Sequence, residues 1–160
     1  MDLCSQLAKL GLQLREITGD GNCLFRAFGD LYDGIGDKHG QHRRAVTDYM
    51  LQHREEFDSF VEDGVTFDTH VANLRMPCTH AGNDAIVAFA RLHLVNVIIH
   101  QVNSPCWQIR GAEEADARQL HIAYHNGNHY SSIRRMGDNT SKPADIYIKD
   151  VDGSGSSLLI

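Results

Sequence analysis

The chain has 160 residues, 42% of them hydrophobic and 22% charged, which is the composition of a single globular domain. Its formal net charge of −6 argues against a nucleic-acid-binding protein, which would carry a basic patch, and no apolar run is long enough to cross a bilayer. The four cysteines stand far apart, without a Cys-x-x-Cys pair. We therefore expect neither a disulfide framework nor a zinc cluster, and a reducing compartment, the cytoplasm or also the nucleus.

The first part of the chain is predicted to be mostly helical. Leu3, Leu7 and Leu10 recur at helical spacing before Gly11, and a weak strand follows at Leu12. Further helical patterns follow this strand, at residues 23–32, 42–61, 67–74 and 83–94.

After residue 94 the pattern changes to that of strands. Residues 95–102 are almost continuously β-branched, which predicts a central strand buried on both faces, and a short strand is expected at 107–109. Residues 120–124 alternate, and 129–135 return as their partner strand after an Asn-Gly pair that favours a tight turn. Because helices come first and a sheet of hairpins later, we predict an α+β domain rather than a repeated βαβ unit.

The stretch Gly19-Asp20-Gly21-Asn22-Cys23 is the most distinctive in the chain. Its glycines and its Asp-Gly pair predict a tight, irregular loop, and a helix begins at Cys23. A thiol at a helix N-terminus is favoured as the reactive thiolate by the helix dipole and by unpaired backbone N–H groups. A lone cysteine is more often a small buried hydrophobe, but a core cysteine does not need to follow such a loop. We therefore predict that Cys23 is a nucleophile.

A nucleophilic thiol needs a base, and His129 is the best candidate among the ten histidines. It opens the last strand directly after a tight turn, where a rigid backbone can hold the ring while leaving it open to a cleft. Of the other histidines, His42 is predicted to lie on the surface and His100 to be a hydrogen-bonded core group. His129 follows Cys23 by 129 − 23 = 106 positions, an order that permits a papain-like site and excludes the caspase order.

These residues predict thiol-dependent hydrolysis of an amide bond. Cys23 as thiolate attacks the carbonyl carbon, and His129 holds the thiolate as an ion pair and then protonates the departing amine. The oxyanion would be bound by backbone N–H groups of Asp20, Gly21 and Cys23, because the glycines let the backbone approach closely. Water then hydrolyses the thioester, and no metal or organic cofactor is required.

The same residues resemble a known family, the OTU (ovarian tumour) deubiquitinases. The strings G-D-G-N-C-L-F-R at 19–26 and H-Y-S-S-I at 129–133 are similar to two motifs of that family, and residues 81–90 are similar to its middle motif. The resemblance covers about residues 3–135. It implies an α+β, papain-like cysteine-protease fold, with helices packed around a small central β-sheet.

The resemblance also implies a function and its partners. The family members are isopeptidases that remove ubiquitin from lysine side chains, and some relatives favour atypical chain linkages. We therefore expect ubiquitin, polyubiquitin chains or ubiquitinated proteins as partners, and neither nucleic acid nor a membrane. The chain is expected to act as a monomer and without a cofactor or metal.

The third member of the catalytic site is less obvious from the sequence. Asp20 matches the family position of an acidic triad member, although an Asp-Gly pair is also ordinary turn chemistry. Ser131 lies two residues beyond His129 in the strand and so points to the same face. Many relatives have Asp or Asn there, and serine is a weaker partner for an imidazole N–H. This difference shifts more of the orienting role to Asp20.

The sequence does not fix the substrate-binding residues. The net negative charge of the chain suits the arginine-bearing tail of ubiquitin. Glu62-Asp63 or Glu113-Glu114 could contribute acceptors for this tail, although such pairs more commonly lie on the solvated surface. Trp107 and Tyr130 could line a channel, although a lone tryptophan beside apolar strands more often belongs to the core.

The catalytic domain is predicted to span residues 1–137. Residues 138–160, with a Gly-Ser-rich stretch at 153–157, are predicted to form a flexible polar tail or a vector-derived remnant. Two arginine pairs, at 43–44 and 134–135, are expected on the solvated surface. No three-helix ubiquitin-associated module, which often follows the catalytic domain in the related group, is predicted, so we expect the catalytic piece alone.

Four other functions are weaker candidates. The loop glycines lack the third glycine or the Gly-Lys-Ser/Thr of a phosphate-binding loop, and the acidic residue between them would repel a phosphate. A zinc site built from Cys106, His121, His125 and His129 is conceivable, but its spacing is that of no known zinc motif. A catalytically weak ubiquitin-binding module and a protease for another ubiquitin-like modifier remain as alternatives.

Overall fold

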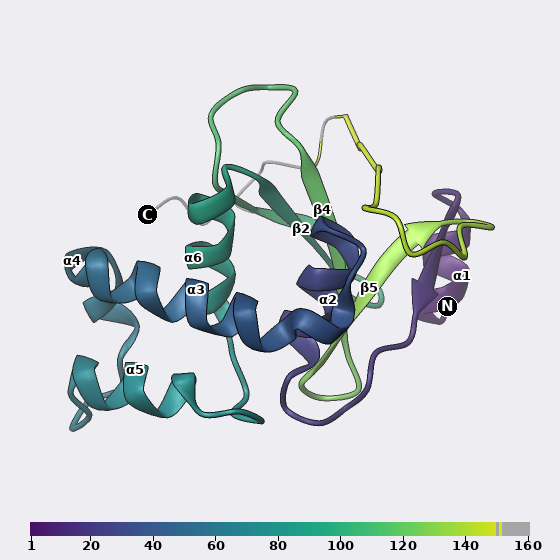
Figure 1. Cartoon of the computed structure of the whole chain (residues 1–160). Helices are drawn as coiled ribbons and strands as arrows, with labels where there is room; N and C mark the ends of the chain where they lie inside the picture. The colour runs from purple at the N-terminus through teal and green to yellow at the C-terminus, as the bar shows by residue number, and fades with distance from the viewer. Residues whose placement is uncertain (150, 152–160) are drawn as a thin grey trace.

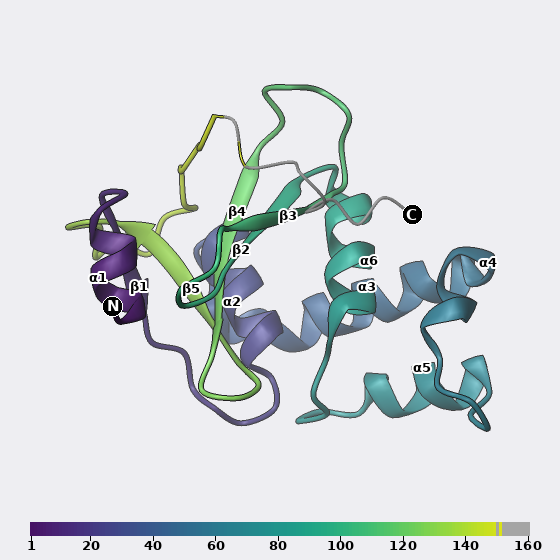
Figure 2. The same ribbon diagram turned by 180° about the vertical axis from the view of Figure 1, so that it is seen from behind.

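The computed structural model describes residues 1–149 and 151, in which a five-stranded mixed sheet is flanked by helices (Figures 1 and 2). The strands are β1 (Leu12–Arg15), β2 (Asn96–His100), β3 (Trp107–Arg110), β4 (Gln119–His125) and β5 (His129–Arg135). They lie in the order β1-β5-β4-β2-β3, with β2 and β4 parallel and all other neighbours antiparallel. The predicted α+β class is confirmed.

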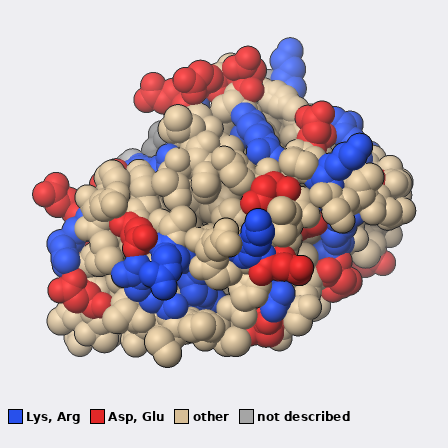
Figure 3. All heavy atoms as spheres, viewed as in Figure 1, with Lys and Arg blue, Asp and Glu red and all other residues tan. Residues whose placement is uncertain are grey.

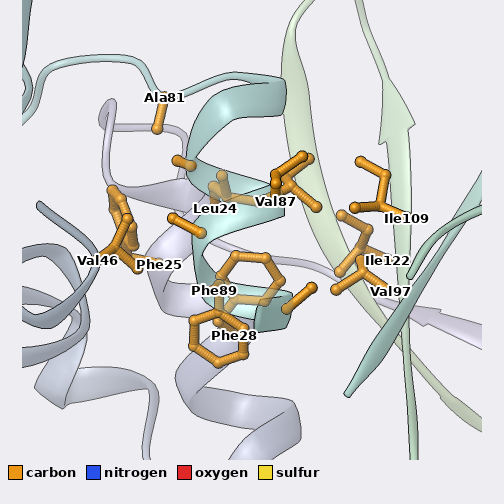
Figure 4. Close-up of a cluster of buried hydrophobic side chains, with 14 of the residues drawn as sticks. Leu24, Phe25, Phe28, Val46, Ala81, Val87, Phe89, Val97, Ile109 and Ile122 are labelled. Carbon is orange, nitrogen blue, oxygen red and sulfur yellow. The ribbon is translucent and has the colours of Figure 1, made fainter. Parts of the chain in front are cut away.

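The helices are α1 (Leu3–Ala8), α2 (Cys23–Tyr32), α3 (His39–Gln52), α4 (Arg54–Phe57), α5 (Phe67–Arg75) and α6 (Asn83–His93), with 3₁₀ turns at Gly36–Lys38 and Asp58–Phe60. α2 packs against β4 and β5, and α1 lies on the opposite face of the sheet (Figure 2). The main core fills the space between the helices and the sheet, where the rings of Phe28 and Phe89 stack at 3.9 Å (Figure 4). Among the described residues, no helix has the length and apolar character needed to span a membrane.

Two predictions about helix ends are wrong. The single helix expected over 42–61 begins earlier and breaks at His53, whose φ of −125° and ψ of 42° are not helical. The ring of His53 stacks on Tyr49 at 4.0 Å, and its Nδ1 lies 2.9 Å from the Tyr49 carbonyl oxygen, so local contacts favour the break. Leu94, expected to face inward, is the left-handed C-cap of α6 and is 68% exposed.

The β4–β5 hairpin forms as predicted. Asn126 and Gly127 have positive φ values of 54° and 90°, conformations that Asn and Gly adopt readily in a tight turn. The turn sets His125 opposite His129 in the antiparallel register. His129 is thereby placed at the first position of β5, next to the loop that precedes α2.

The first part of the predicted flexible tail packs on the domain. The backbone N–H of Ala144 donates to the Leu31 carbonyl oxygen at 2.9 Å. The side chain of Gln119 donates to the carbonyl oxygen of Ile148 and accepts from its backbone N–H. Ile146 is buried in a second apolar cluster with Leu7, Leu12, Ala123 and Ile133, on the α1 side of the sheet. The predicted boundary at residue 137 therefore leaves out a packed segment, whereas the Gly-Ser-rich stretch 153–157 lies outside the described residues.

Arg134, expected on the surface, is fully buried. Its guanidinium donates to the Asp30 carboxylate of α2 at 3.0 Å, to the Asp138 carboxylate at 3.1 Å and to the Lys142 carbonyl oxygen at 2.7 Å. A buried cation is tolerated only when its donors are paired in this way. The network ties β5 and α2 to the C-terminal segment, which explains why this segment is ordered against the sheet.

Candidate active site

Cys23 is the first residue of α2 and is 4% exposed. The backbone N–H of Tyr130 donates to its Sγ at 3.5 Å, which joins the start of α2 to the start of β5. Such a donor stabilises a thiolate more than a thiol, as does the N-terminal end of the helix dipole. The two segments that the sequence singled out are therefore in direct contact, although Tyr130 rather than His129 makes the hydrogen bond.

The loop before Cys23 has the backbone that its glycines predict. Gly21 has a φ of +85°, and a Cβ atom at this position would lie 2.1 Å from the carbonyl oxygen of Cys78, so only glycine fits. In the described part of the chain, the N–H groups of Asp20 and Gly21 donate to no acceptor, whereas the N–H of Asn22 is bound to the Asp20 carboxylate at 3.0 Å. The N–H of Cys23, at the start of α2, likewise has no acceptor among the described residues, so all three N–H groups predicted for the oxyanion hole are available to a substrate.

Asn22 and Arg43 hold this loop in place, and sequence reasoning missed both. The buried Asn22 side chain accepts from the Cys78 N–H and from Arg43 Nη2, each at 2.8 Å. Arg43, expected on the surface, is only 3% exposed and also donates to the carbonyl oxygens of Leu74 at 2.6 Å and Thr79 at 3.0 Å. In the sequence, the only feature that pointed to these contacts was Asn22 itself, a polar residue directly before the cysteine.

Asp20 is placed beside Arg26 rather than beside the histidine. Arg26 Nη2 lies 2.6 Å from Asp20 Oδ2, and Arg26 Nε contacts both carboxylate oxygens at 3.2 Å. These bonds, followed by those from Asn22, hold the pKa of Asp20 well below its usual range. In the described part of the chain, no hydrogen bond links the Asp20 carboxylate to His129. Its role as a triad member stays a prediction, and the geometry indicates a loop-holding carboxylate.

We expect Asp20→Ala to lower kcat roughly ten- to a hundredfold, much less than Cys23→Ala. The substitution removes the ion pair with Arg26 that holds the loop, but it leaves Cys23 and His129 in place. Steady-state turnover of one fluorogenic substrate measures both variants. Arg26→Gln is the matched control, since it breaks the same ion pair from the other side. A loss in Asp20→Ala equal to that of Cys23→Ala, with Arg26→Gln fully active, would instead make Asp20 a direct catalytic group.

His129 lies along the loop that leads to Cys23. A Cβ atom at Gly19 would be 3.6 Å from His129 Nδ1, so this glycine allows the loop to pass close to the ring. The His125 ring meets the His129 ring edge to face, with centroids 5.3 Å apart. Ser131, considered as a weak orienting partner, is fully buried, and its Oγ lies 2.9 Å from His125 Nε2. The hydroxyl is thus engaged by His125 within the described structure.

The conceivable zinc site does not assemble. His121 Nδ1 lies 2.9 Å from His100 Nε2, and His121 Nε2 lies 2.8 Å from the side-chain oxygen of Gln119, so both ring nitrogens are engaged. Burial lowers the pKa of both histidines, that of His100 to about 4, and keeps the pair uncharged. No cluster of three or more His, Cys, Asp or Glu side chains suited to a metal ion occurs in residues 1–149 and 151. The core position predicted for His100 is confirmed.

Two neighbouring cavities share Gly82 and Asn83 in their linings, and the first of them borders Tyr130. The first, about 380 Å³, is lined by Trp107 and Tyr130, as expected for the walls of a channel. The second cavity, about 400 Å³, is lined by Glu62 and Asp84. The first cavity thus borders Tyr130, whose backbone contacts the cysteine, and the second adds acidic residues beside it.

Comparison with known families agrees with the motifs. The sequence profile described as "OTU-like cysteine protease" matches residues 18–130. The chain belongs to this family. As an OTU domain it is 56% identical over 90% of its length to the mouse "OTU domain-containing protein 3". It is 36% identical over 96% of its length to the Arabidopsis thaliana "OVARIAN TUMOR DOMAIN-containing deubiquitinating enzyme 7". It spans 36% and 41% of these two relatives, less than half of each.

Solved OTU domains share the fold of this chain. The OTU domain of OTUD1 has a TM-score of 0.73 at 20% identity, over 81% of this chain and 90% of the other. An ovarian tumour domain solved in complex with ubiquitin has a TM-score of 0.62 at 18% identity, over 81% of this chain and 78% of the other. These likenesses confirm the predicted papain-like OTU fold.

Proposed function

We propose that this chain is a deubiquitinase, a thiol-dependent isopeptidase that cleaves the bond between the C-terminal glycine of ubiquitin and a lysine side chain. The observation that carries the proposal is the junction of α2 and β5, where Cys23 accepts a hydrogen bond from Tyr130 directly beside His129. A buried thiol at a helix N-terminus, hydrogen-bonded to the residue that directly follows a histidine, suits an activated cysteine nucleophile. The ubiquitin complex of a related fold supports ubiquitin as the substrate.

Each residue has a defined role in the reaction. The Cys23 thiolate forms a bond to the glycine carbonyl carbon, and the carbonyl oxygen becomes an oxyanion that the N–H groups of Asp20, Gly21 and Cys23 face. As this intermediate collapses, the C–N bond breaks, and the His129 imidazolium gives its proton to the lysine amine. His129 then takes a proton from the water that attacks the thioester, and the C–S bond breaks. This step regenerates the Cys23 thiolate and the His129 imidazolium, while the released ubiquitin carboxyl group loses its proton to solvent.

The two cavities that share Gly82 and Asn83 suit the C-terminal tail of ubiquitin. This tail carries arginines and ends in two glycines, so it needs a narrow channel near the thiol and carboxylates farther away. Trp107 and Tyr130 supply the narrow part, and Glu62 supplies an exposed carboxylate in the adjoining cavity. The Asp84 carboxylate lies 2.6 Å from His70 Nε2 and is less free to pair with the substrate.

We expect Glu62→Lys to raise KM roughly five- to tenfold with kcat nearly unchanged, because the charge reversal repels the arginines of the tail but leaves the reacting groups intact. Steady-state hydrolysis of a ubiquitin C-terminal amide measures both constants. Glu113→Lys is the matched control: it makes the same change of charge in a separate cavity, which Arg91 and Arg110 also line. Equal KM values for the two variants would contradict the assignment of the tail to the Glu62 cavity.

Cleavage of di-ubiquitin tests the proposed function directly. The purified chain should release monoubiquitin from isopeptide-linked dimers, and a panel covering every lysine linkage would show whether atypical linkages are preferred. Binding without cleavage would favour the ubiquitin-binding module, and cleavage of another modifier alone would favour the second alternative. We propose the cytoplasm, with the nucleus as a second compartment, as its place of action.

A further inference from the structure

A third cavity borders the catalytic loop on the side of α3 and is strongly basic. Its volume is about 300 Å³, and it is lined by Asn22 of the loop together with His39, Arg43, Arg44 and Arg75. None of its lining residues is acidic, although the whole chain carries a formal net charge of −6. Lys and Arg side chains gather over the region of α3 and α5 in Figure 3. This cavity therefore differs in charge from the cavity that Glu62 and Asp84 line.

Several donors in this cavity have no partner. The Nε of Arg43 is buried and, among the described residues, lacks a hydrogen-bond acceptor, as does Nδ1 of His39. Arg44 is exposed, and its guanidinium contacts no acceptor in the described part of the chain, so it is free to bind a ligand, whereas Arg75 is paired with Asp48 outside the cavity lining. A buried donor without an acceptor costs free energy unless a ligand or water satisfies it. These groups indicate that an acceptor belongs in the cavity.

The start of α3 adds a second positive contribution. α3 runs for 14 residues from His39, and the side chain of its N-cap, Lys38, makes no capping hydrogen bond. His39 and Gly40, in the first turn, line the cavity. The first turn of a helix presents unpaired backbone N–H groups and the positive end of the helix dipole, which together favour an anion.

The electrostatics of His39 agree with this arrangement. Burial, followed by the positive charge of Arg26, lowers the pKa of His39, and Arg43 acts in the same direction. The carboxylates of Asp20 and Asp37 oppose this effect without cancelling it. The ring is thus a neutral donor or acceptor in an electropositive place.

We propose that this cavity binds an oxyanion, a phosphoryl or carboxylate group, held by Arg44, by the Nε of Arg43 and by the first turn of α3. Bidentate guanidinium contacts and helix N–H groups are suited to such groups. Arg43 also donates to the carbonyl oxygen of Gly21 and to the Asn22 side chain. A bound anion would therefore stabilise the loop that precedes Cys23, which makes the cavity a second binding site coupled to the catalytic one.

The test uses inorganic phosphate and the whole chain, without ubiquitin, so that it does not depend on the proposed enzymatic function. Phosphate is titrated against sodium chloride at matched ionic strength, and the Tm and the NMR signals of the His39 ring and the Gly40 amide are followed. We expect saturable changes, and a titration midpoint of His39 that moves to higher pH when phosphate is bound. A parallel titration with acetate compares carboxylate with phosphoryl as the favoured group.

Two variants make the result specific. Arg44→Ala should weaken phosphate binding roughly tenfold, because it removes a charge-assisted contact. Arg54→Ala, on α4 and outside the cavity, removes an exposed arginine that is paired with Asp68 and should leave the affinity unchanged. A wild-type response no larger than that to sodium chloride, or equal affinities for the two variants, would overturn the proposal.

Discussion

Cys23→Ala is expected to abolish turnover, lowering kcat by at least about 10⁴-fold, because no other group can form the thioester. Alanine fits the space of the buried thiol and is a good helix former, so the variant should fold, with a Tm close to that of the wild type. The substitution removes the weak hydrogen bond from the Tyr130 N–H and the packing of the sulfur in the main core. Single-turnover cleavage of di-ubiquitin measures the residual rate.

Cys78→Ala is the matched control for this loss. Cys78 is exposed and lies beside the same loop, where Asn22 Nδ2 donates to its Sγ at 3.4 Å. We expect it to retain most of the activity, because the loop is held mainly through the backbone N–H of Cys78, which the substitution keeps. Activity that survives in Cys23→Ala but disappears in Cys78→Ala would show that Cys78, not Cys23, is the nucleophile.

His129→Gln is expected to lower kcat by about 10³-fold, since both the ion pair with the thiolate and the proton for the amine are lost. Glutamine keeps a polar side chain at the strand end, so the hairpin should remain folded. The effect should appear in kcat more than in KM, because ubiquitin binding relies on other residues. Stopped-flow measurement of acylation separates this step from product release.

His125→Gln removes an imidazole from the same hairpin and therefore controls for the loss of the ring alone. Burial, followed by the charge of the neighbouring His129, lowers the pKa of His125, which makes it a poorer source of the imidazolium. We expect at least half of the wild-type kcat at pH 7.5. A larger loss of kcat in His125→Gln than in His129→Gln would show that His125, not His129, is the catalytic base.

Local patterns predicted the elements that carry the site. The Asp-Gly loop, the start of α2 at Cys23 and the Asn-Gly turn before His129 all depend on backbone preferences of the residues themselves. For the same reason the order of helices and strands, and with it the α+β class, followed from periodicity.

The errors concern residues whose surroundings come from distant parts of the chain. Arg43 and Arg134 look like surface arginines in the sequence, but carbonyl oxygens and carboxylates from other elements satisfy them in the interior. His42, also expected on the surface, is 8% exposed and packs near Phe89. The ion pair of Asp20 with Arg26 is a local contact between residues 20 and 26, and the triad role of Asp20 stays a prediction.

The most direct test of the central claim uses ubiquitin carrying a thiol-reactive electrophile at its C-terminus. We expect intact mass spectrometry to show one ubiquitin adduct on the wild type and on Cys78→Ala, a much slower adduct on His129→Gln and none on Cys23→Ala. This pattern would establish together that Cys23 is activated by His129 and that ubiquitin is recognised. No adduct on the well-folded wild type, or an adduct that persists on Cys23→Ala, would contradict the proposed deubiquitinase.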